Sequence, residues 1–226
     1  MEIFIDSANV SEIEKWLDMG VIDGVTTNPS IMLKDGVYDV EREAKKIAKL
    51  IHPKPLSVEV TTNDTGEMLV QARRFASLAP NIAVKIPNIN QDGVPCYGII
   101  RQLEKEGIKI NATAVLSLGQ VILAAKAGAT YISIFAGRVS DEGGNAAEVI
   151  MNSVEWLKRW DYKSKILVGS IRSVGDVLMA AMAGAHIVTI PPQLITKMAD
   201  HKYTRDTVKQ FVDDAQKALE MMEKGK

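Results

Sequence analysis

The pentapeptide AVKIP at residues 83–87 places Lys85 in the middle of an apolar run. Removing an ammonium group from water is costly unless the group is paired or neutralised. One interpretation of Lys85 is therefore a structural ion pair. The other is a nucleophile, because burial favours the neutral amine, which can attack a carbonyl carbon to form a Schiff base. The run by itself does not choose between the two.

Polar residues take an equivalent position in other apolar runs. Alternate side chains of a β-strand point to opposite faces. If Val84 and Ile86 face surrounding helices, Lys85 faces the opposite side, and the same alternation brings a set of polar residues there. This set consists of Asp6, Asn28, Glu59, Asn111, Thr113 and Ser133. They lie late in their runs, and the carboxyl ends of barrel strands are where barrel enzymes place their chemistry.

Simpler interpretations apply to some members of this set. An Asp or Asn that ends a strand is often a turn residue or the N-cap of the next helix. For Asp6 and Asn28, taken alone, this structural role explains the residue as well as a role in chemistry does. Glu59 lies between two valines, where a carboxylate is rarely buried without a role or a partner. Its most direct partner would be Lys85.

Two glycine-containing segments, FAGRVS at 135–140 and VGSIRS at 168–173, offer groups that bind anions. Arg138 and Arg172 supply guanidinium groups, Ser170 supplies a hydroxyl, and the turns supply backbone N–H groups, which together suit a phosphate. Arginines in surface loops are also common. The hypothesis of an anion site therefore depends on these segments lying on the same rim as Lys85.

The runs that carry these residues alternate with helical segments along the whole chain. Eight runs rich in Val and Ile are expected to be strands, at 3–6, 24–28, 56–60, 83–87, 108–115, 131–135, 165–170 and 186–190. Helical spacing of apolar residues is clearest at 41–51, 66–78, 116–127, 146–160 and 174–183. Repeats of roughly 20 to 30 residues predict an α/β fold, a single-domain (β/α)8 TIM barrel over residues 1–226, with a doubly wound open sheet as the alternative.

Glycines mark the expected joints between helices and strands. Each lies just before the core of a strand run, where the C-cap of the preceding helix belongs; they are Gly24, Gly107, Gly128 and Gly184.

An extra C-terminal helix is expected at 204–223. Its apolar residues fall on one stripe: Val208, Phe211, Val212, Ala215, Leu219 and Met222. Such a stripe needs a surface to cover it, either the chain's own barrel or a neighbouring subunit.

Composition and charge limit the classes of molecule that the protein is expected to bind. A net charge of -1 and a pI near 6.3, with no basic patch, argue against nucleic acid and membrane surfaces and favour small molecules. Cys96 is the only cysteine, which excludes an intrachain disulfide and suits a reducing, cytoplasmic location. The segment MEIFIDSANV lacks the basic and apolar regions of a signal peptide.

No cofactor or metal is expected. The sequence contains no GxGxxG, GxxxxGK or HExxH motif. His52, His186 and His201 are scattered without the spacing of metal ligands.

Seven motifs occur in a fixed order across nearly the whole chain: FIDSAN, GVTTNPS, SVEV, VKIP, NATAV, SIFAGR and GSIR. They resemble the short transaldolase family, which also includes fructose-6-phosphate aldolases. VTTNPS, and a lysine in VKIP one strand after SVEV, make the resemblance specific. It implies a class I aldolase barrel that acts on sugar phosphates through a Schiff base. It also implies a homo-oligomer, a pentamer or decamer, in which the C-terminal helix packs on a neighbouring subunit.

The resemblance implies a role for each matched residue. Lys85 matches the Schiff-base lysine, Asp6 the acid–base carboxylate, and Glu59 with Thr113 the pair that holds a catalytic water. The matched substrate ligands are Asn28, Asn111 and Ser133, and the matched phosphate ligands are Arg138, Ser170 and Arg172.

Two positions bear on the reaction type. Within the family, glutamate on the third strand and phenylalanine on the sixth resemble transaldolases, whereas glutamine and tyrosine resemble fructose-6-phosphate aldolases. Glu59 and Phe135 therefore imply transfer of a dihydroxyacetone unit from fructose 6-phosphate or sedoheptulose 7-phosphate to an aldose phosphate, as in the pentose phosphate pathway. The alternatives are an aldolase-type lyase and a non-catalytic barrel that binds sugar phosphates.

Departures from the usual family pattern leave the substrate tail open. Ile134 and Ala136 replace residues of the usual SPFVGR, and Ala114 and Leu116 replace residues of the usual TLVF. These positions flank the acceptor and phosphate regions. A sulfonated ketose, whose tail could use the same two arginines, is therefore a further alternative.

Overall fold

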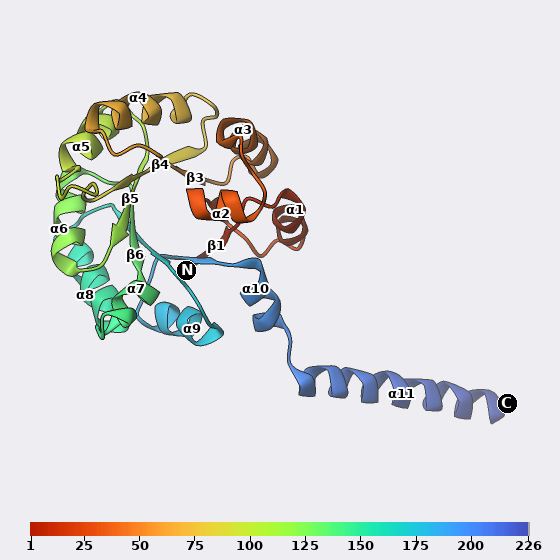
Figure 1. The fold of residues 1–226 in the computed structure, drawn as a ribbon. Helices are drawn as coiled ribbons and strands as arrows, with labels where there is room; N and C mark the ends of the chain where they lie inside the picture. Colours follow the sequence, from red (N-terminus) through yellow and green to blue (C-terminus); the bar gives the residue numbers. More distant parts are fainter. Residues whose placement is uncertain (226) are drawn as a thin grey trace. The chain divides into compact units, whose positions relative to one another are not determined.

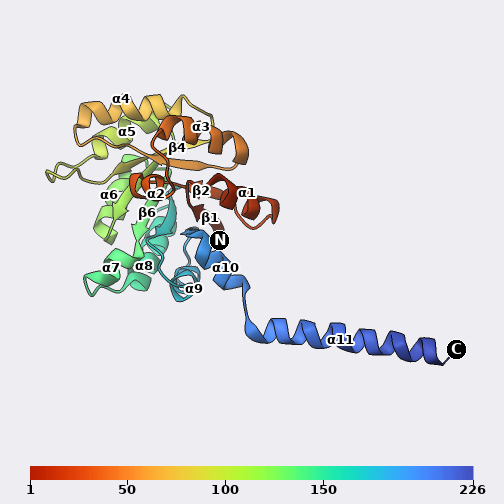
Figure 2. The same ribbon diagram turned by 45° about the vertical axis from the view of Figure 1, so that its right-hand side comes forward.

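The structure, a computed structural model, describes residues 1–225, and in that range eight parallel strands close into a barrel in sequence order. The strands are β1 (Glu2–Asp6), β2 (Gly24–Thr26), β3 (Leu56–Glu59), β4 (Ile82–Pro87), β5 (Ile110–Val115), β6 (Tyr131–Phe135), β7 (Lys165–Gly169) and β8 (Ile187–Ile190). The helices around them are α1 (Val10–Asp18), α2 (Pro29–Lys34), α3 (Val40–Ile51), α4 (Thr65–Ala76), α5 (Tyr97–Lys105), α6 (Leu118–Ala127), α7 (Ala136–Asp141), α8 (Ala146–Arg159) and α9 (Val174–Met182) (Figures 1 and 2). The predicted (β/α)8 barrel is confirmed. Pairing of β8 with β1 excludes the open sheet.

The chain forms two compact units. The first, Met1–Pro192, contains the barrel and its helices. The second begins at Gln193 and contains most of α10 (Pro192–Ala199) and all of α11 (Lys202–Lys224).

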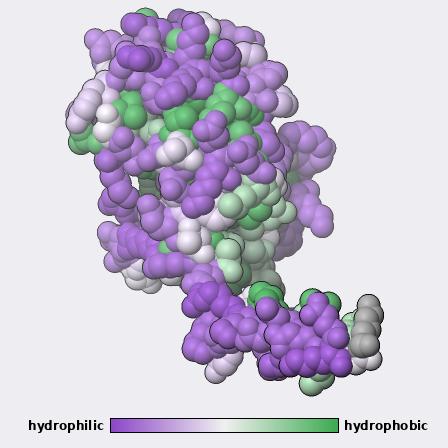
Figure 3. All heavy atoms as spheres, turned by 90° about the vertical axis from the view of Figure 1, so that its right-hand side faces the viewer, coloured by the Kyte–Doolittle hydropathy of each residue, from purple (hydrophilic) through white to green (hydrophobic). Residues whose placement is uncertain are grey.

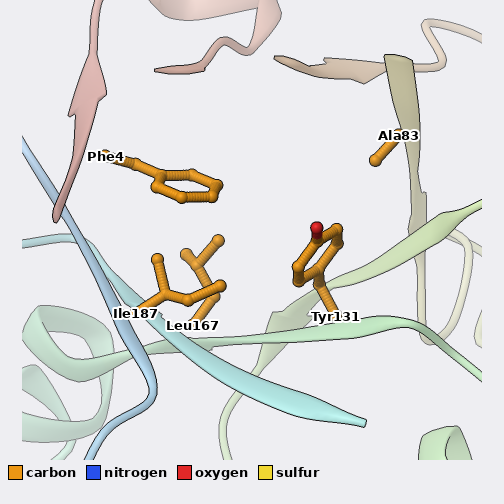
Figure 4. Packing of buried hydrophobic residues seen from close by; sticks show 5 residues of the cluster. All are labelled: Phe4, Ala83, Tyr131, Leu167 and Ile187. Carbon is orange, nitrogen blue, oxygen red and sulfur yellow. The ribbon is translucent and has the colours of Figure 1, made fainter. Parts of the chain in front are cut away.

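The side chains inside the barrel form an apolar layer and, closer to the carboxyl ends of the strands, a polar layer. Five inward side chains from different strands point toward one another and form a buried cluster: Phe4, Ala83, Tyr131, Leu167 and Ile187 (Figure 4). The residues two positions further along these strands have the same orientation. They form the next layer toward the carboxyl ends: Asp6, Lys85, Ser133, Gly169 and Thr189. The polar layer therefore rests on a packed apolar floor.

Gly24 has a different role from the predicted one. It is the first residue of β2, without the left-handed backbone of a C-cap. A Cβ at position 24 would lie 2.7 Å from ring carbons of Phe4, so the glycine makes room for that ring inside the barrel. The other three predicted joints, Gly107, Gly128 and Gly184, do have positive φ.

The apolar stripe predicted for the C-terminal helix is present in α11. No residue between Lys202 and Lys224 is buried, and the apolar side chains of the stripe, such as Phe211 and Leu219, are exposed. Figure 3 shows hydrophobic patches among hydrophilic side chains on the face it presents. That a neighbouring subunit covers the stripe stays a prediction. Among residues 1–225, no helix combines the length and hydropathy that crossing a membrane requires.

Gly24→Ala should lower the free energy of unfolding by about 1–3 kcal/mol, because the added methyl group overlaps the Phe4 ring in a filled barrel interior. Gly98→Ala in α5 is the matched control, since a Cβ there meets no atom within 4 Å. The control should be neutral or stabilising by up to about 1 kcal/mol, as expected for alanine in a helix. Urea unfolding of both variants measures the difference, and equal midpoints would contradict the packing role of Gly24.

Candidate active site

A cavity of about 470 Å³ opens at the carboxyl ends of the strands. Its wall contains eight of the predicted site residues: Asp6, Asn28, Glu59, Lys85, Ser133, Phe135, Arg138 and Ser170. The remaining wall residues are Thr26, Pro29, Ser30, Leu167, Gly169 and Thr189. The cavity lies within the size range of small-molecule sites. The inward parity of the strands therefore brings most of the predicted residues to one place.

Lys85 and Glu59 form an ion pair in this wall. The two residues are partners in the register of β4 and β3, and Lys85 Nζ lies 2.8 Å from Glu59 Oε2. Nζ also donates to the carbonyl oxygen of Thr27 at 3.1 Å. The Lys85 side chain is 5% exposed and that of Glu59 is 23% exposed. The pair therefore reaches solvent through its carboxylate, while the amine stays enclosed.

Asp6 ends β1 and is held by hydroxyl groups. Thr26 Oγ1 donates to Asp6 Oδ1 at 2.6 Å, and Thr189 Oγ1 lies 2.5 Å from Thr26 Oγ1. Burial raises the pKa of Asp6 above its usual value, although the Thr26 hydrogen bond and the charge of Lys85 act in the opposite direction. Asp6 is thus a carboxylate whose protonation is easier than that of an exposed aspartate.

Asn28 is the N-cap of α2 and also lies in the cavity wall. Its Oδ1 accepts from the backbone N–H of Ile31 at 2.9 Å and so caps α2, with Pro29 in the first turn. The residue also lines the cavity. Because the cap uses Oδ1, the amide nitrogen is the group that Asn28 can offer to a ligand as a donor.

Asn111 lies behind the cavity wall and links two serines. Ser133 Oγ donates to Asn111 Oδ1 at 2.6 Å, and Asn111 Nδ2 donates to Ser57 Oγ at 3.2 Å. Asn111 is fully buried and is the register partner of Lys85 on β5. Its contacts fix the orientation of the Ser133 hydroxyl, which does line the cavity.

Thr113 is also buried outside the cavity wall. Its hydroxyl has no hydrogen-bond partner within the described residues, and a buried polar group without a partner calls for an explanation such as a bound water. The strand is irregular here, because Ala114 has a φ of 58° and the register with β6 shifts between Ala112 and Val115. Strained backbone of this kind clusters at functional sites.

Helix α7, which begins directly after β6, touches the loop after β7 through Gly137 and Ser170. The backbone N–H of Gly137 donates to the carbonyl oxygen of Ser170 at 3.2 Å. A Cβ at position 137 would lie 2.5 Å from that oxygen and 2.8 Å from Ser170 Oγ, so only glycine permits the contact. Ser170 itself has a φ of 58°, a left-handed backbone that is unusual for serine. Ser170 and Arg138, the residue after Gly137, both line the cavity.

Arg172 is engaged by a carboxylate that the sequence analysis did not identify. Its guanidinium group donates to Asp141 through Nη1 at 2.5 Å and Nη2 at 2.6 Å. This fork holds the pKa of Asp141 below its usual value. Nε of Arg172 lies toward Gly137 in the first turn of α7, 2.8 Å from where a Cβ of residue 137 would be. Arg172 is therefore next to the predicted anion site but outside the cavity wall.

Thr26 and Thr189 are two hydroxyl residues of the cavity wall that the sequence analysis missed. Both lie in predicted strands with the inward parity, which was the available signal. No cluster of three or more His, Cys, Asp or Glu side chains within residues 1–225 is placed to hold a metal ion.

Comparison with known proteins gives one family. The family model described as transaldolase/fructose-6-phosphate aldolase matches residues 3–226. A probable transaldolase of Clostridium botulinum (strain Langeland) is 40% identical over 219 residues, 97% of this chain and 98% of the relative. A probable transaldolase of Syntrophobacter fumaroxidans is 41% identical, covering 96% and 97% of the two chains. One of Anaeromyxobacter sp. (strain Fw109-5) is 42% identical, covering 96% and 98%.

Solved structures share the fold at low identity. Thiamine phosphate pyrophosphorylase from Pyrococcus furiosus aligns with a TM-score of 0.56 at 14% identity, over 84% of this chain and 85% of that chain. A mandelate oxidase variant aligns with a TM-score of 0.58 at 15% identity, over 84% and 64%. These likenesses support the barrel alone.

Asp6→Asn should raise the free energy of unfolding at neutral pH, because the wild-type fold partly desolvates a charged carboxylate and the amide is neutral. The pKa of Asp6 is higher in the folded than in the unfolded protein. At pH values between these two pKa values, Asp6 therefore gains a proton when the protein folds. The advantage of the variant is therefore greatest above the folded pKa and shrinks as the pH approaches the unfolded value. Urea unfolding of both proteins from neutral pH to about pH 4 measures this gap. A gap that does not change with pH would contradict the raised pKa.

Proposed function

The chain belongs to the transaldolase/fructose-6-phosphate aldolase family, and on this basis we propose that it is a transaldolase that works through a Schiff base on Lys85. The proposed reaction moves a dihydroxyacetone unit from a ketose phosphate, such as fructose 6-phosphate or sedoheptulose 7-phosphate, to an aldose phosphate. The observation that carries the proposal is the enclosed Lys85 amine, 2.8 Å from Glu59 and facing a cavity that Asp6 also lines.

The first step is formation of the Schiff base. Glu59 takes a proton from Lys85 across the 2.8 Å contact, and the neutral amine attacks C2 of the ketose to give a carbinolamine. The same carboxylate then returns a proton, through a water, to the C2 hydroxyl, which leaves as water and yields the iminium. The unpaired Thr113 hydroxyl, on the strand next to Lys85, is suited to hold that water.

The second step is cleavage between C3 and C4. Asp6 accepts the proton of the C4 hydroxyl, the C4 oxygen becomes a carbonyl, and the electrons of the C3–C4 bond pass to the iminium to form an enamine. An aldose phosphate leaves, and the three-carbon unit stays on Lys85. Asn28 and Ser133 line the cavity, and in the proposed mechanism the amide nitrogen and the hydroxyl bind substrate hydroxyl groups.

The anionic tail of the substrate is assigned to the end of the cavity formed by Arg138 and Ser170, with Arg172 beside it. A guanidinium group, a hydroxyl and backbone N–H groups bind phosphate oxygens well. A sulfonate has similar oxygens with less charge and is the alternative tail. Pairing of Arg172 with Asp141 reduces the positive charge at this end.

Phe135 favours transfer over simple release. It lines the cavity and has no hydroxyl group with which to protonate the enamine. The enamine then persists until an aldose acceptor arrives, which distinguishes a transaldolase from an aldolase-type lyase. We place the enzyme in the cytoplasm, in the pentose phosphate pathway, as a homo-oligomer in which the exposed stripe of α11 is covered by a neighbouring subunit.

Borohydride reduction with fructose 6-phosphate should add a three-carbon unit to Lys85, detected by mass spectrometry of the intact protein and its peptides. Lys85→Met should abolish the adduct because the attacking amine is lost. Lys165→Met is the matched control, since Lys165 is also paired with a glutamate, Glu2 at 2.6 Å, but at the opposite ends of the strands. The control should keep the adduct. A wild-type protein that forms no adduct with any phosphorylated or sulfonated ketose would support a non-catalytic binding barrel instead.

Phe135→Tyr should raise the release of free dihydroxyacetone without an acceptor by about tenfold or more, because the new hydroxyl can donate a proton to the enamine. An enzymatic assay for dihydroxyacetone measures the rate. Phe211→Tyr in α11 adds the same hydroxyl on an exposed side chain and should leave the rate unchanged. Equal release by wild type and Phe135→Tyr would contradict the role given to the phenyl ring.

A further inference from the structure

Two threonine hydroxyls meet beside the Asp6 carboxylate, and the catalytic steps above use neither. Thr26 lies on β2 and Thr189 on β8, the two strands that flank β1. Their oxygens are 2.5 Å apart, and Thr26 Oγ1 is 2.6 Å from Asp6 Oδ1. Both threonines are buried, with 2% and 4% of their surface exposed, and both line the cavity. The contact therefore joins three adjacent strands across the seam where the barrel closes.

Counting protons gives the direction of this chain. A threonine hydroxyl has one proton to donate, and an ionised carboxylate can only accept. With Asp6 ionised, the Thr26 proton points to Oδ1, and the contact between the two hydroxyls must then be a donation from Thr189 to Thr26. A hydrogen bond to a charged acceptor is strengthened when its donor itself accepts one.

We propose that Thr189 is a positioning residue for Asp6: its donation to Thr26 keeps the Thr26 proton on Oδ1 and leaves Oδ2 to take the proton of the substrate's C4 hydroxyl. This inference rests on the proposed function of the site. Thr189 acts through Thr26 on the acid–base carboxylate, and the required property is a hydroxyl at position 189 rather than a particular shape.

The strands are suited to keep this geometry. Thr189 is the register partner of Phe4, and Thr26 is the register partner of Asp6. Ile187, two residues before Thr189, packs in the apolar cluster with Phe4. The backbone positions of both threonines are thus fixed by sheet pairing and by the floor beneath them. Loss of one hydroxyl should change the proton arrangement without moving the strands.

The effect of removing the Thr189 hydroxyl on the titration of Asp6 depends on the charged groups that face Asp6. They are Lys85 on β4, Glu59 on β3 and Asp35 after α2, and Arg138 lines the same cavity. None of them changes when the Thr189 hydroxyl is removed. The bond from Thr26 then weakens, and the ionised form of Asp6 loses more than the neutral form because the charged acceptor gains most from it. Asp6 should therefore take up its proton at a higher pH.

The test compares Thr189→Val, which has nearly the same shape, with Thr189→Ser, which keeps the hydroxyl. In transfer from fructose 6-phosphate to an aldose phosphate, Thr189→Val should lower kcat about five- to tenfold with little change in KM, the size expected for one hydrogen bond. The acidic limb of its kcat/KM profile should move to higher pH. Borohydride should trap more six-carbon than three-carbon adduct, because the Schiff base still forms and cleavage is slowed.

Three controls separate positioning from general damage. Thr189→Ser should restore kcat and the pH profile. Thr130→Val removes a threonine hydroxyl that also donates to a carboxylate, Glu104 at 2.8 Å, outside the site, and should leave both unchanged. Thr26→Val combined with Thr189→Val should be no slower than Thr26→Val alone, because the second hydroxyl acts through the first. Thr189→Ala takes the place of Thr189→Val if the valine variant does not fold.

The outcomes distinguish this inference from the proposed function. No lysine adduct in the wild type would overturn both. A wild type with adducts, beside a Thr189→Val variant with the same kcat, pH profile and adduct ratio, would overturn the positioning role alone. Failure of Thr189→Ser to restore activity, or additive losses in the double variant, would also overturn it.

Discussion

The site depends on an ammonium group that is kept out of water beside a carboxylate. Lys85 and Glu59 can occupy such a place because they are register partners on neighbouring strands and because the Thr27 carbonyl gives Nζ a second acceptor. A buried pair of this kind tolerates little rearrangement, since separating the charges leaves each one unpaired. The barrel meets this demand with parallel strands closed on each other and an apolar layer under the pair.

Uncharged side chains form hydrogen-bonded links between the strands that surround the charged residues. One chain of hydrogen bonds runs from Ser133 through Asn111, the register partner of Lys85, to Ser57. Another joins the two threonines to Asp6. Hydroxyl and amide groups can be donors and acceptors at once, so they connect strands without adding charge to the interior. Four charged side chains, two cations and two carboxylates, can then share one cavity wall.

Much of the site could be predicted from the sequence because strand parity depends on local geometry alone. Lys85, Glu59 and Asp6 lie where alternation placed them. Alternation does not give depth, so it could not tell that Asn111 and Thr113 are enclosed behind the wall. Alternation along a strand also cannot predict contacts between residues that are distant in the sequence. The pairing of Arg172 with Asp141 and the Phe4 ring against position 24 link residues with no shared local pattern, and the expectation for Gly24 was wrong for this reason.

Asn28 ties the stability of a short helix to the contents of the cavity. The six-residue helix α2 depends on this side chain for its N-cap, and the same amide faces the ligand space. A ligand that accepts from the amide nitrogen would favour the orientation that also caps the helix. By thermodynamic linkage, such a ligand would make fraying of α2 rarer, and fraying of α2 would weaken binding of the ligand.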